Sequence, residues 1–287
     1  MKKTYKPVIL IITLLIALTT GACNKLMTAK KDGAANLMYE FSGNKSYPYE
    51  QTSKTTQTVV FSGQEMNTVV NTKLGFTVNG RGIANDTLIM GVTIDTLGLK
   101  INSMQGNITE NVSSIKGKSF LMSMDQKGGN KDLDEAEKIT YSIANMQSSN
   151  MKASFISIFP GLPEENIQIG YTWQETDTVN ISTETENAEI IMTSNNTVEA
   201  KENISGYECY KISYTIEGTR DGSSQTAQGL IITNADVSGT GYFYFAVNEG
   251  VIVSDHTDAK SDGTLTIPTG ESLPMFITTV SDLSLLK

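Results

Sequence analysis

Few residues in this chain are of the types that carry enzyme chemistry. His256 is the only histidine, and Cys23 and Cys209 are the only cysteines. A metal site with two histidine ligands is therefore excluded, and a serine or cysteine hydrolase would rely on His256 as its base. The surrounding stretch SDHTDAKSDG is polar and typical of a turn, which favours a surface histidine. We predict that the protein is not an enzyme.

The acidic residues offer calcium ligands, but their spacing does not fit a known loop. Asp255, Asp258 and Asp262 lack the alternating acidic pattern of an EF-hand. The stretch NKDLDEAEK fails the same test, because Glu135 stands where that loop needs glycine. Asp132 as N-cap and Glu135 three residues later instead predict a capping box at the start of a helix. We therefore predict no metal site and no cofactor.

The chain begins with a basic segment, an uncharged run of 11 residues at 8–18, and small residues before Cys23. A bilayer-spanning helix needs about 20 apolar residues, so this profile indicates a signal peptide. The segment TGAC at 20–23 resembles the lipobox of bacterial lipoprotein signal peptides, with Thr20 in place of the usual bulky apolar residue. The resemblance implies removal of residues 1–22 and lipid attachment at Cys23. The alternative is an ordinary secretory signal with an incidental cysteine.

Charge and cysteine content exclude further classes of partner and site. Removal of residues 1–22 takes away three of the 22 basic residues, which leaves a balance of 19 − 31 = −12. A chain this acidic is repelled by nucleic acid, so we predict no such partner. With Cys23 bound to lipid, Cys209 has no cysteine to pair with, and we expect a structural thiol there. The predicted contact with the membrane is the lipid anchor.

The elements that position these residues are predicted to be mainly β, because the hydrophobic period outside residues 131–160 is two. The clearest strand is 66–78, where alternate residues from Met66 to Val78 are apolar or threonine and the residues between them are mostly polar. At about 3.3 Å per residue this strand extends about 43 Å, which favours a large curved sheet. Residues 88–94 and 210–216 alternate in the same way.

The strands belong to an internal repeat. A shift of 122 residues aligns 88–95 with 210–217 and 117–128 with 239–250, and a shift of 124 aligns 47–52 with 171–176. Three blocks in order at a nearly constant offset indicate a duplication. We predict two duplicated antiparallel β halves with long curved strands, either half-barrel or sandwich-like, joined by one amphipathic helix.

The helix is predicted between the halves, where apolar residues recur at the spacing of three and four from Leu133 to Ala144. The apolar residues from Met146 to Phe159 are expected in the core, with a lipid cavity as the alternative. Pro160 and Pro163 then end helical structure. The predicted organisation is signal peptide 1–22, flexible tether 23–36, first β half 37–130, helical connector 131–160 and second β half 161–287.

The segment FPGLPEENIQIGYTW at 159–173 resembles a stretch of uncharacterised Bacteroidota lipoproteins that carry a domain of unknown function. The matching positions are Leu162, Pro163, Ile169, Gly170 and Trp173. The resemblance implies many long strands, an outer-membrane location and no assigned activity. Surface lipoproteins of that group commonly carry an acidic cluster after the cysteine, whereas Asn24 and Lys25 follow here, which favours the periplasmic side. Long antiparallel strands with a short helix are also similar to the lipoprotein-carrier type of half barrel.

Two aromatic segments are the hints of a binding site. The strand GYFYF places Tyr242 and Tyr244 on one face and Phe243 and Phe245 on the other, so it is either buried on both faces or exposed to an apolar ligand. Trp173 is expected in the core, with stacking on a sugar as the alternative. Three functions remain: binding of an apolar ligand such as a lipid, docking on an envelope protein or a glycan, and hydrolysis. We favour the first, with ligand-binding residues unknown.

Overall fold

The computed structural model describes residues 34–41, 43, 45–104, 106–129, 131–143, 149–182, 186–226 and 228–287. The predicted signal peptide, nearly all of the predicted tether and the predicted lipid site Cys23 therefore lie outside the described residues. Met146 and the end of the predicted helix at Ala144 also lie outside them.

The described chain is built of long strands and three short helical turns. In chain order the elements are β1 (Ser46–Phe61), β2 (Gln64–Ala84), β3 (Thr87–Ser103), β4 (Gly106–Asn111), the 3-10 turn η1 (Ser113–Ile115), β5 (Ser119–Asp125), α1 (Asp134–Glu137), β6 (Thr140–Tyr141), β7 (Ser149–Asn150), α2 (Lys152–Phe155), β8 (Thr172–Ser182), β9 (Glu186–Ile204), β10 (Tyr207–Thr226), β11 (Gly229–Ala246), β12 (Val251–Thr266) and β13 (Ser272–Leu285).

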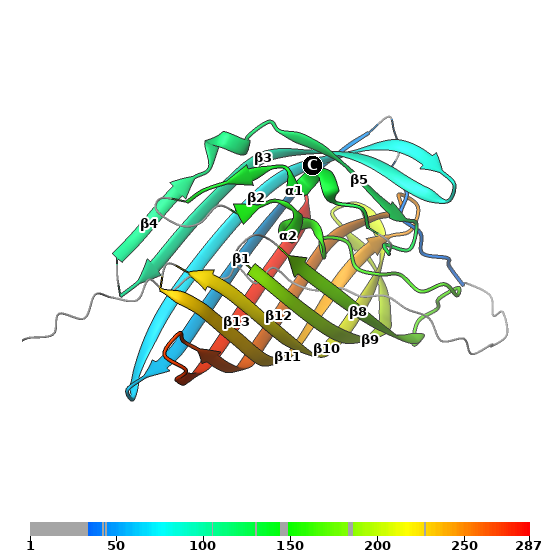
Figure 1. The fold of residues 1–287 in the computed structure, drawn as a ribbon. Coiled ribbons are helices and arrows are strands. Elements are labelled where there is room, and N and C mark those ends of the chain that lie inside the picture. The colour runs from blue at the N-terminus through cyan, green and yellow to red at the C-terminus, as the bar shows by residue number, and fades with distance from the viewer. Residues whose placement is uncertain are drawn as a thin grey trace, which may run out of the picture.

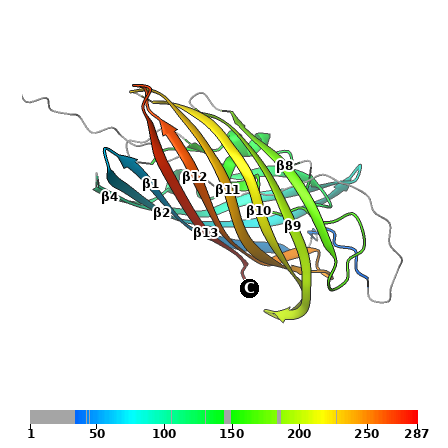
Figure 2. The ribbon, with the colours of Figure 1, turned by 90° about the horizontal axis from the view of Figure 1, so that it is seen from below.

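Eleven strands form one antiparallel sheet, which confirms the mainly β prediction. Their order is β4-β3-β2-β1-β13-β12-β11-β10-β9-β8, with β5 beside β4 on the same edge of β3. Figure 1 shows that the sheet is strongly curved and does not close. The first and last strands, β1 and β13, pair in its middle, so both predicted halves belong to one continuous sheet. Seen from below, the long strands β8 to β13 run side by side (Figure 2).

The alternation predicted for residues 66–78 is confirmed in β2. The even-numbered residues from Thr68 to Val78 are buried on the concave face, whereas Asn67 and Lys73 on the other face are exposed. Successive side chains of a strand point to opposite faces, so one face of β2 packs in the core and the other meets solvent. The alternate residues of 88–94 in β3 and of 210–216 in β10 are buried in the same way.

The connections in the two halves of the chain are alike. β1, β2 and β3 form a meander from the middle of the sheet to one edge, and β8, β9 and β10 form a meander inward from the other edge. The aligned glycines Gly128 and Gly250 both have positive φ, +89° and +64°, which glycine adopts without strain. Segment 37–41 passes between these two turns, because Tyr39 N–H donates to Gln126 O and Glu40 N–H donates to Gly250 O.

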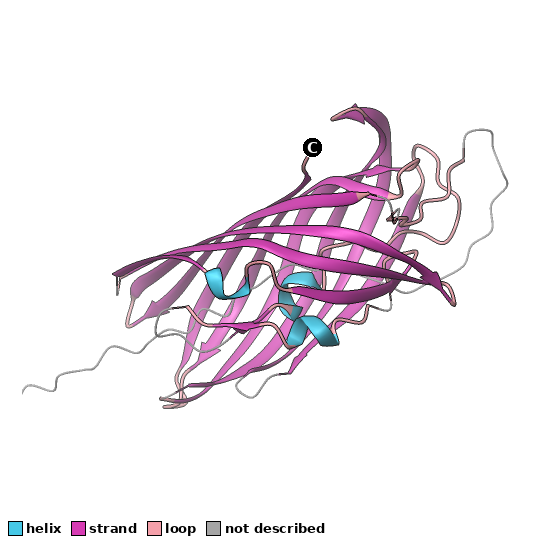
Figure 3. Ribbon diagram, turned by 90° about the horizontal axis from the view of Figure 1, so that it is seen from above, coloured by secondary structure: helices cyan, strands magenta, loops and turns pink. Residues whose placement is uncertain are grey.

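The connector between β5 and β8 covers the concave face of the sheet (Figure 3). It contains two helical turns of four residues each, α1 and α2, instead of the single amphipathic helix that was predicted. Ile139 and Ile143 are buried as predicted, but they lie after α1 in irregular segments on either side of the short strand β6. Burial of an irregular connector therefore produced the helical spacing of apolar residues.

Two phenylalanines of the connector form the centre of the core. Phe155 packs edge-on against Phe76 and Phe120, with ring centroids 5.1 and 5.0 Å apart. Phe159 contacts Tyr39, Phe41 and Tyr49 at centroid distances of 5.6, 5.3 and 6.0 Å. Both phenylalanines are completely buried, and such aromatic pairs add about 0.5–1.5 kcal/mol each beyond the burial of their area.

The connector also covers the free edge of β5. Glu135 accepts a hydrogen bond from the Leu121 backbone N–H at 2.7 Å, and Ser123 and Asp132 exchange backbone hydrogen bonds. The predicted capping box was therefore wrong: Leu133 is the N-cap of α1, without a side-chain cap, and Asp132 accepts from the Asp134 N–H. The Glu135 carboxylate thus accepts a hydrogen bond from the edge strand β5 and does not cap its own helix.

No helix in the described ranges has the length and apolar character needed to cross a membrane.

We predict that Phe159→Ala lowers the free energy of unfolding by about 3–5 kcal/mol, because it leaves a cavity among three aromatic rings. Urea unfolding followed by circular dichroism measures this loss. Phe276→Ala is the matched control, because Phe276 is 43% exposed and its truncation is expected to cost less than about 1 kcal/mol. Equal losses in the two variants would show that the connector does not hold the core together.

Candidate functional site

A cleft of about 1880 Å³ lies between the edge strand β8 and the connector. Every residue from Gln168 to Asn180 lines it on one side, together with Asn195–Thr197 of the neighbouring β9. Residues of the connector line the other side: Lys131, Leu133, Lys152, Ile156, Leu162 and Pro163. The volume exceeds the range of about 300–1,000 Å³ that is usual for small-molecule pockets. This cleft is the candidate binding site.

The cleft exists because the connector covers the β5 edge of the sheet but not the β8 edge. The edge of β5 is covered by Glu135 and Asp132, whereas β8 pairs only with β9 among the described strands. The connector reaches β8 at Gly161, where a side chain would collide with the Glu175 carboxylate. The connector backbone therefore lies close to the end of the flexible Glu175 side chain.

An aromatic pair forms one part of the wall. Tyr171, just before β8, and Trp173 on the inner face of β8 are partly exposed, with ring centroids 6.0 Å apart and an interplanar angle of 32°. Tyr171 O–H donates to Glu165 Oε2 at 3.1 Å. Burial and this carboxylate raise the pKa of Tyr171 to about 12. The Trp173 Nε1–H is buried and has no hydrogen-bond partner in the described structure.

Charged residues continue along the inner face of β8. Asp177 and Glu175 follow Trp173 at alternate positions, and Lys131 interacts electrostatically with both from the connector. Burial lowers the pKa of the Lys131 ammonium to about 8, although these carboxylates and Asp125 oppose the shift. Burial raises the pKa of Asp177, which Lys131 and the Thr178 N–H partly offset. The cleft therefore combines an aromatic wall with a partly desolvated charge cluster.

The other two lysines of the cleft are bound to protein oxygens. Lys127 Nζ donates to Asn36 Oδ1, Leu37 O and Pro163 O at 2.7, 2.6 and 2.8 Å. It thereby ties segment 34–41 and the connector to the end of β5. Lys152 Nζ pairs with Glu137 at 2.7 Å. Neither lysine needs a ligand to complete its contacts.

The aromatic strand, predicted as the best hint of a pocket, does not line this cleft. Phe243 and Phe245 of β11 are fully buried, and Phe245 packs edge-on against Tyr39 at 5.4 Å. Tyr242 lies on the outer face and is 37% exposed. The strand thus fills the core with one face and meets solvent with the other. Trp173, which was expected in the core, packs against its margin and lines the cleft.

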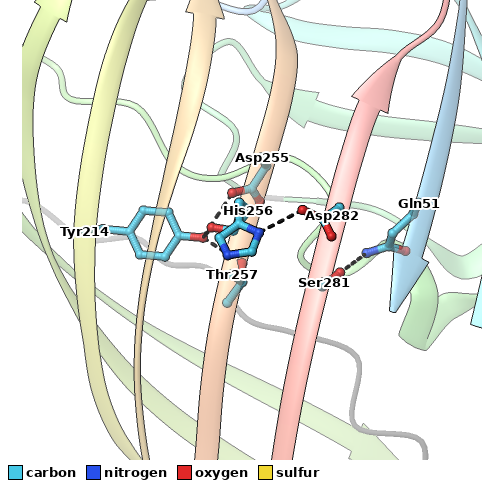
Figure 4. A network of polar contacts seen from close by, with 7 residues as sticks. All are labelled: Gln51, Tyr214, Asp255, His256, Thr257, Ser281 and Asp282. Atoms are coloured by element: carbon cyan, nitrogen blue, oxygen red, sulfur yellow. Dashed lines mark hydrogen bonds and ion pairs between the residues drawn. The ribbon is translucent and has the colours of Figure 1, made fainter. Parts of the chain in front are cut away.

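His256 lies in the long strand β12, so the turn predicted for SDHTDAKSDG was wrong. The inner residues of this segment include Thr257, Ala259 and Ser261, which are small enough to be buried under the curved sheet. His256 is on the outer face, where its Nδ1 lies 2.7 Å from Asp282 Oδ1 (Figure 4). Its ring also stacks on that of Tyr242. It is a partly exposed surface residue, as expected.

The neighbouring Asp255 belongs to a separate polar network on the inner face. Tyr214 O–H donates to Asp255 Oδ1 at 3.0 Å and lies 2.7 Å from Thr257 Oγ1 (Figure 4). Burial raises the pKa of Asp255 to about 7, and the hydrogen bond from Tyr214 and the nearby His256 oppose this shift. Asp258 and Asp262 are on the outer face of β12, so the three acids do not converge.

The remaining candidates among the described residues are a metal site and Cys209. Among the described residues, no group of three or more His, Cys, Asp or Glu side chains is arranged to hold a metal ion. Cys209 is buried, and burial raises the pKa of its thiol to about 11, so the reactive thiolate is disfavoured.

We predict that Asp255 makes the protein less stable as pH rises from about 4 to about 7. The folded state holds the Asp255 proton in this window and the unfolded chain releases it, so the unfolding free energy falls by of order 1–3 kcal/mol. Asp255→Asn keeps an acceptor for Tyr214 and should remove most of this slope. Urea unfolding at several pH values measures it, and the exposed Asp258→Asn is the control. The same slope in wild type and Asp255→Asn would contradict the prediction.

No protein-family model and no curated protein matches the sequence. Weak structural similarity links it to Pseudomonas aeruginosa OccK2 (OpdF), solved in complex with glucuronate, with 7% identity and a TM-score of 0.28 over 88% of this chain and 100% of that chain. Salmonella typhi OmpF, solved in complex with daunomycin, has 7% identity and a TM-score of 0.23 over 84% of this chain and 98% of that chain. A DUF1329 family protein from Desulfovibrio piger has 9% identity and a TM-score of 0.13 over 82% of this chain and 83% of that chain. Similarities at this level carry no argument about fold or function.

Proposed function

We propose that the protein is a non-enzymatic lipoprotein of the cell envelope that binds an amphiphilic ligand, such as a lipid, in the cleft between β8 and the connector. The observation that carries this proposal is the cleft itself: about 1880 Å³, with an aromatic pair and apolar connector residues on its walls. A site of this size accommodates more than a drug-sized molecule.

The composition of the walls favours an amphiphile over a purely apolar ligand. Ile156 and Ile169 provide apolar surface from the connector, while Glu175 and Asp177 line the same cleft from β8. An acyl chain gains about 0.8 kcal/mol for each methylene that it buries against such a surface. A polar headgroup would contact the charged residues of the cleft, and so offset the free-energy cost of removing water from them.

The sequence supports the location. The leader ends in TGAC, the match to the lipobox, and lipid on Cys23 would hold the protein at a membrane. The resemblance at 159–173 to Bacteroidota lipoproteins favours the outer membrane, and Asn24 and Lys25 after the cysteine favour its periplasmic side. The same segment contributes Ile169, Tyr171 and Trp173 to the cleft.

The alternative is an interaction lipoprotein that docks on an envelope protein or a glycan, and one observation favours it. The 11-residue strand β8 presents a free edge along the cleft, and its outer residues from Thr172 to Asn180 are uncharged. Such an edge can pair with an extended segment of another protein. Copurification of a protein without lipid would select this function.

We expect native mass spectrometry of the full-length protein, purified from its own membranes in a mild nonionic detergent, to show added mass that denaturation removes. The covalent anchor contributes equally to the native and denatured masses, so their difference reports only bound ligand. Trp173 is the only tryptophan, so binding of a brominated lipid should also quench the intrinsic fluorescence of the protein.

Ile169→Glu tests the location of the site, because Ile169 lines the cleft and is 59% exposed. It should lower ligand occupancy about 10-fold or more, since a carboxylate replaces apolar surface. Leu230→Glu is the matched control, 48% exposed on β11 and outside the cleft, and it should bind as wild type does. Equal native and denatured masses together with unquenched Trp173 would overturn the proposed function.

A further inference from the structure

The charges of the cleft restrict the headgroup of its ligand, an inference that rests on the proposed function. Five acidic and three basic residues line the cleft, a balance of 3 − 5 = −2. Two of the three lysines are held by the protein: Lys127 by three oxygens and Lys152 by Glu137. An anionic headgroup would therefore meet more carboxylates than available ammonium groups, which is unfavourable in a partly desolvated site.

The aromatic wall has the features that favour a cation. Tyr171 and Trp173 lie next to each other in the cleft, and tryptophan is the best aromatic partner for an ammonium group. Glu165 lies at the edge of this pair, because it accepts the Tyr171 hydrogen bond at 3.1 Å. A cation on the ring faces would thus have a carboxylate within the same part of the cleft.

The cleft also offers a place for the rest of a zwitterionic molecule. Lys131 is the third lysine of the cleft and faces it from the connector. Ile156 and Ile169 line the same cleft and provide apolar surface for an acyl chain.

We propose that the cleft selects amphiphiles whose headgroup carries an ammonium group, bound at Tyr171 and Trp173 beside Glu165. Phosphatidylethanolamine is the probe of this class, and phosphatidylglycerol with the same acyl chains is its counterpart without an ammonium group. The inference gives the ligand class of the proposed site and adds no chemical step.

The test is a titration of the full-length protein in a nonionic detergent with each of the two lipids, followed by native mass spectrometry. We expect phosphatidylethanolamine to bind about 10-fold more tightly than phosphatidylglycerol, the size of effect that a partly desolvated cation–aromatic contact produces. Glu165→Gln keeps the acceptor for Tyr171 but removes its charge, and should reduce this preference about 3-fold. Glu217→Gln, exposed on β10 and outside the cleft, should leave the preference unchanged.

The outcomes separate this inference from the proposed function. If both lipids bind with the same affinity, the protein binds lipid but the headgroup inference is overturned. A preference for phosphatidylglycerol overturns it in the same way. Binding of neither lipid contradicts the proposed function itself. Because the comparison of the two lipids uses the unaltered chain, its result does not depend on whether Glu165→Gln folds.

Discussion

The fold depends on covering the apolar concave face of a long, curved sheet. A sheet with one dry face must bury it against another layer, and here the connector is that layer, with Phe155 and Phe159 at its centre. Once these rings occupy the interior, the connector has to run from the β5 edge to the β8 edge. It covers the first edge with Glu135 and leaves the second open. The candidate site is therefore the space that the covering layer does not fill.

Much of the sheet could be predicted from the sequence, because strand alternation is a local property. Residues 66–78 alternate over their whole length, and they form one half-buried strand. The helix at 133–144 was predicted wrongly for the opposite reason. Its apolar residues are buried by contacts with the sheet, and burial of Ile139 and Ile143 produced helical spacing without a helix. The segment around His256 was misjudged as a turn because its buried residues are small and polar, which hides the period of two.

The candidate site was less accessible to sequence reasoning, because its walls come from segments that are distant in sequence. Lys131 and Trp173 line the same cleft only because the connector crosses the concave face. The sequence signal was a tyrosine and the only tryptophan at alternate positions, followed by Glu175 and Asp177. That pattern equally describes an aromatic residue in the core and a strand face in solvent. The position of β8 at the open edge of the sheet distinguishes these two cases. Alternation alone does not show which strand lies at an edge.

The pairing of β1 with β13 has a consequence for the order of folding. These strands form the middle of the sheet, yet the contact between Thr55 and Thr279 joins residues 224 positions apart. The two meanders consist of hairpins between neighbouring strands, which form early, whereas closing so long a loop is slow. A chain emerging from the ribosome therefore carries two unjoined meanders with open inner edges until its last strand is released. Chaperones that shield strand edges would act on this interval.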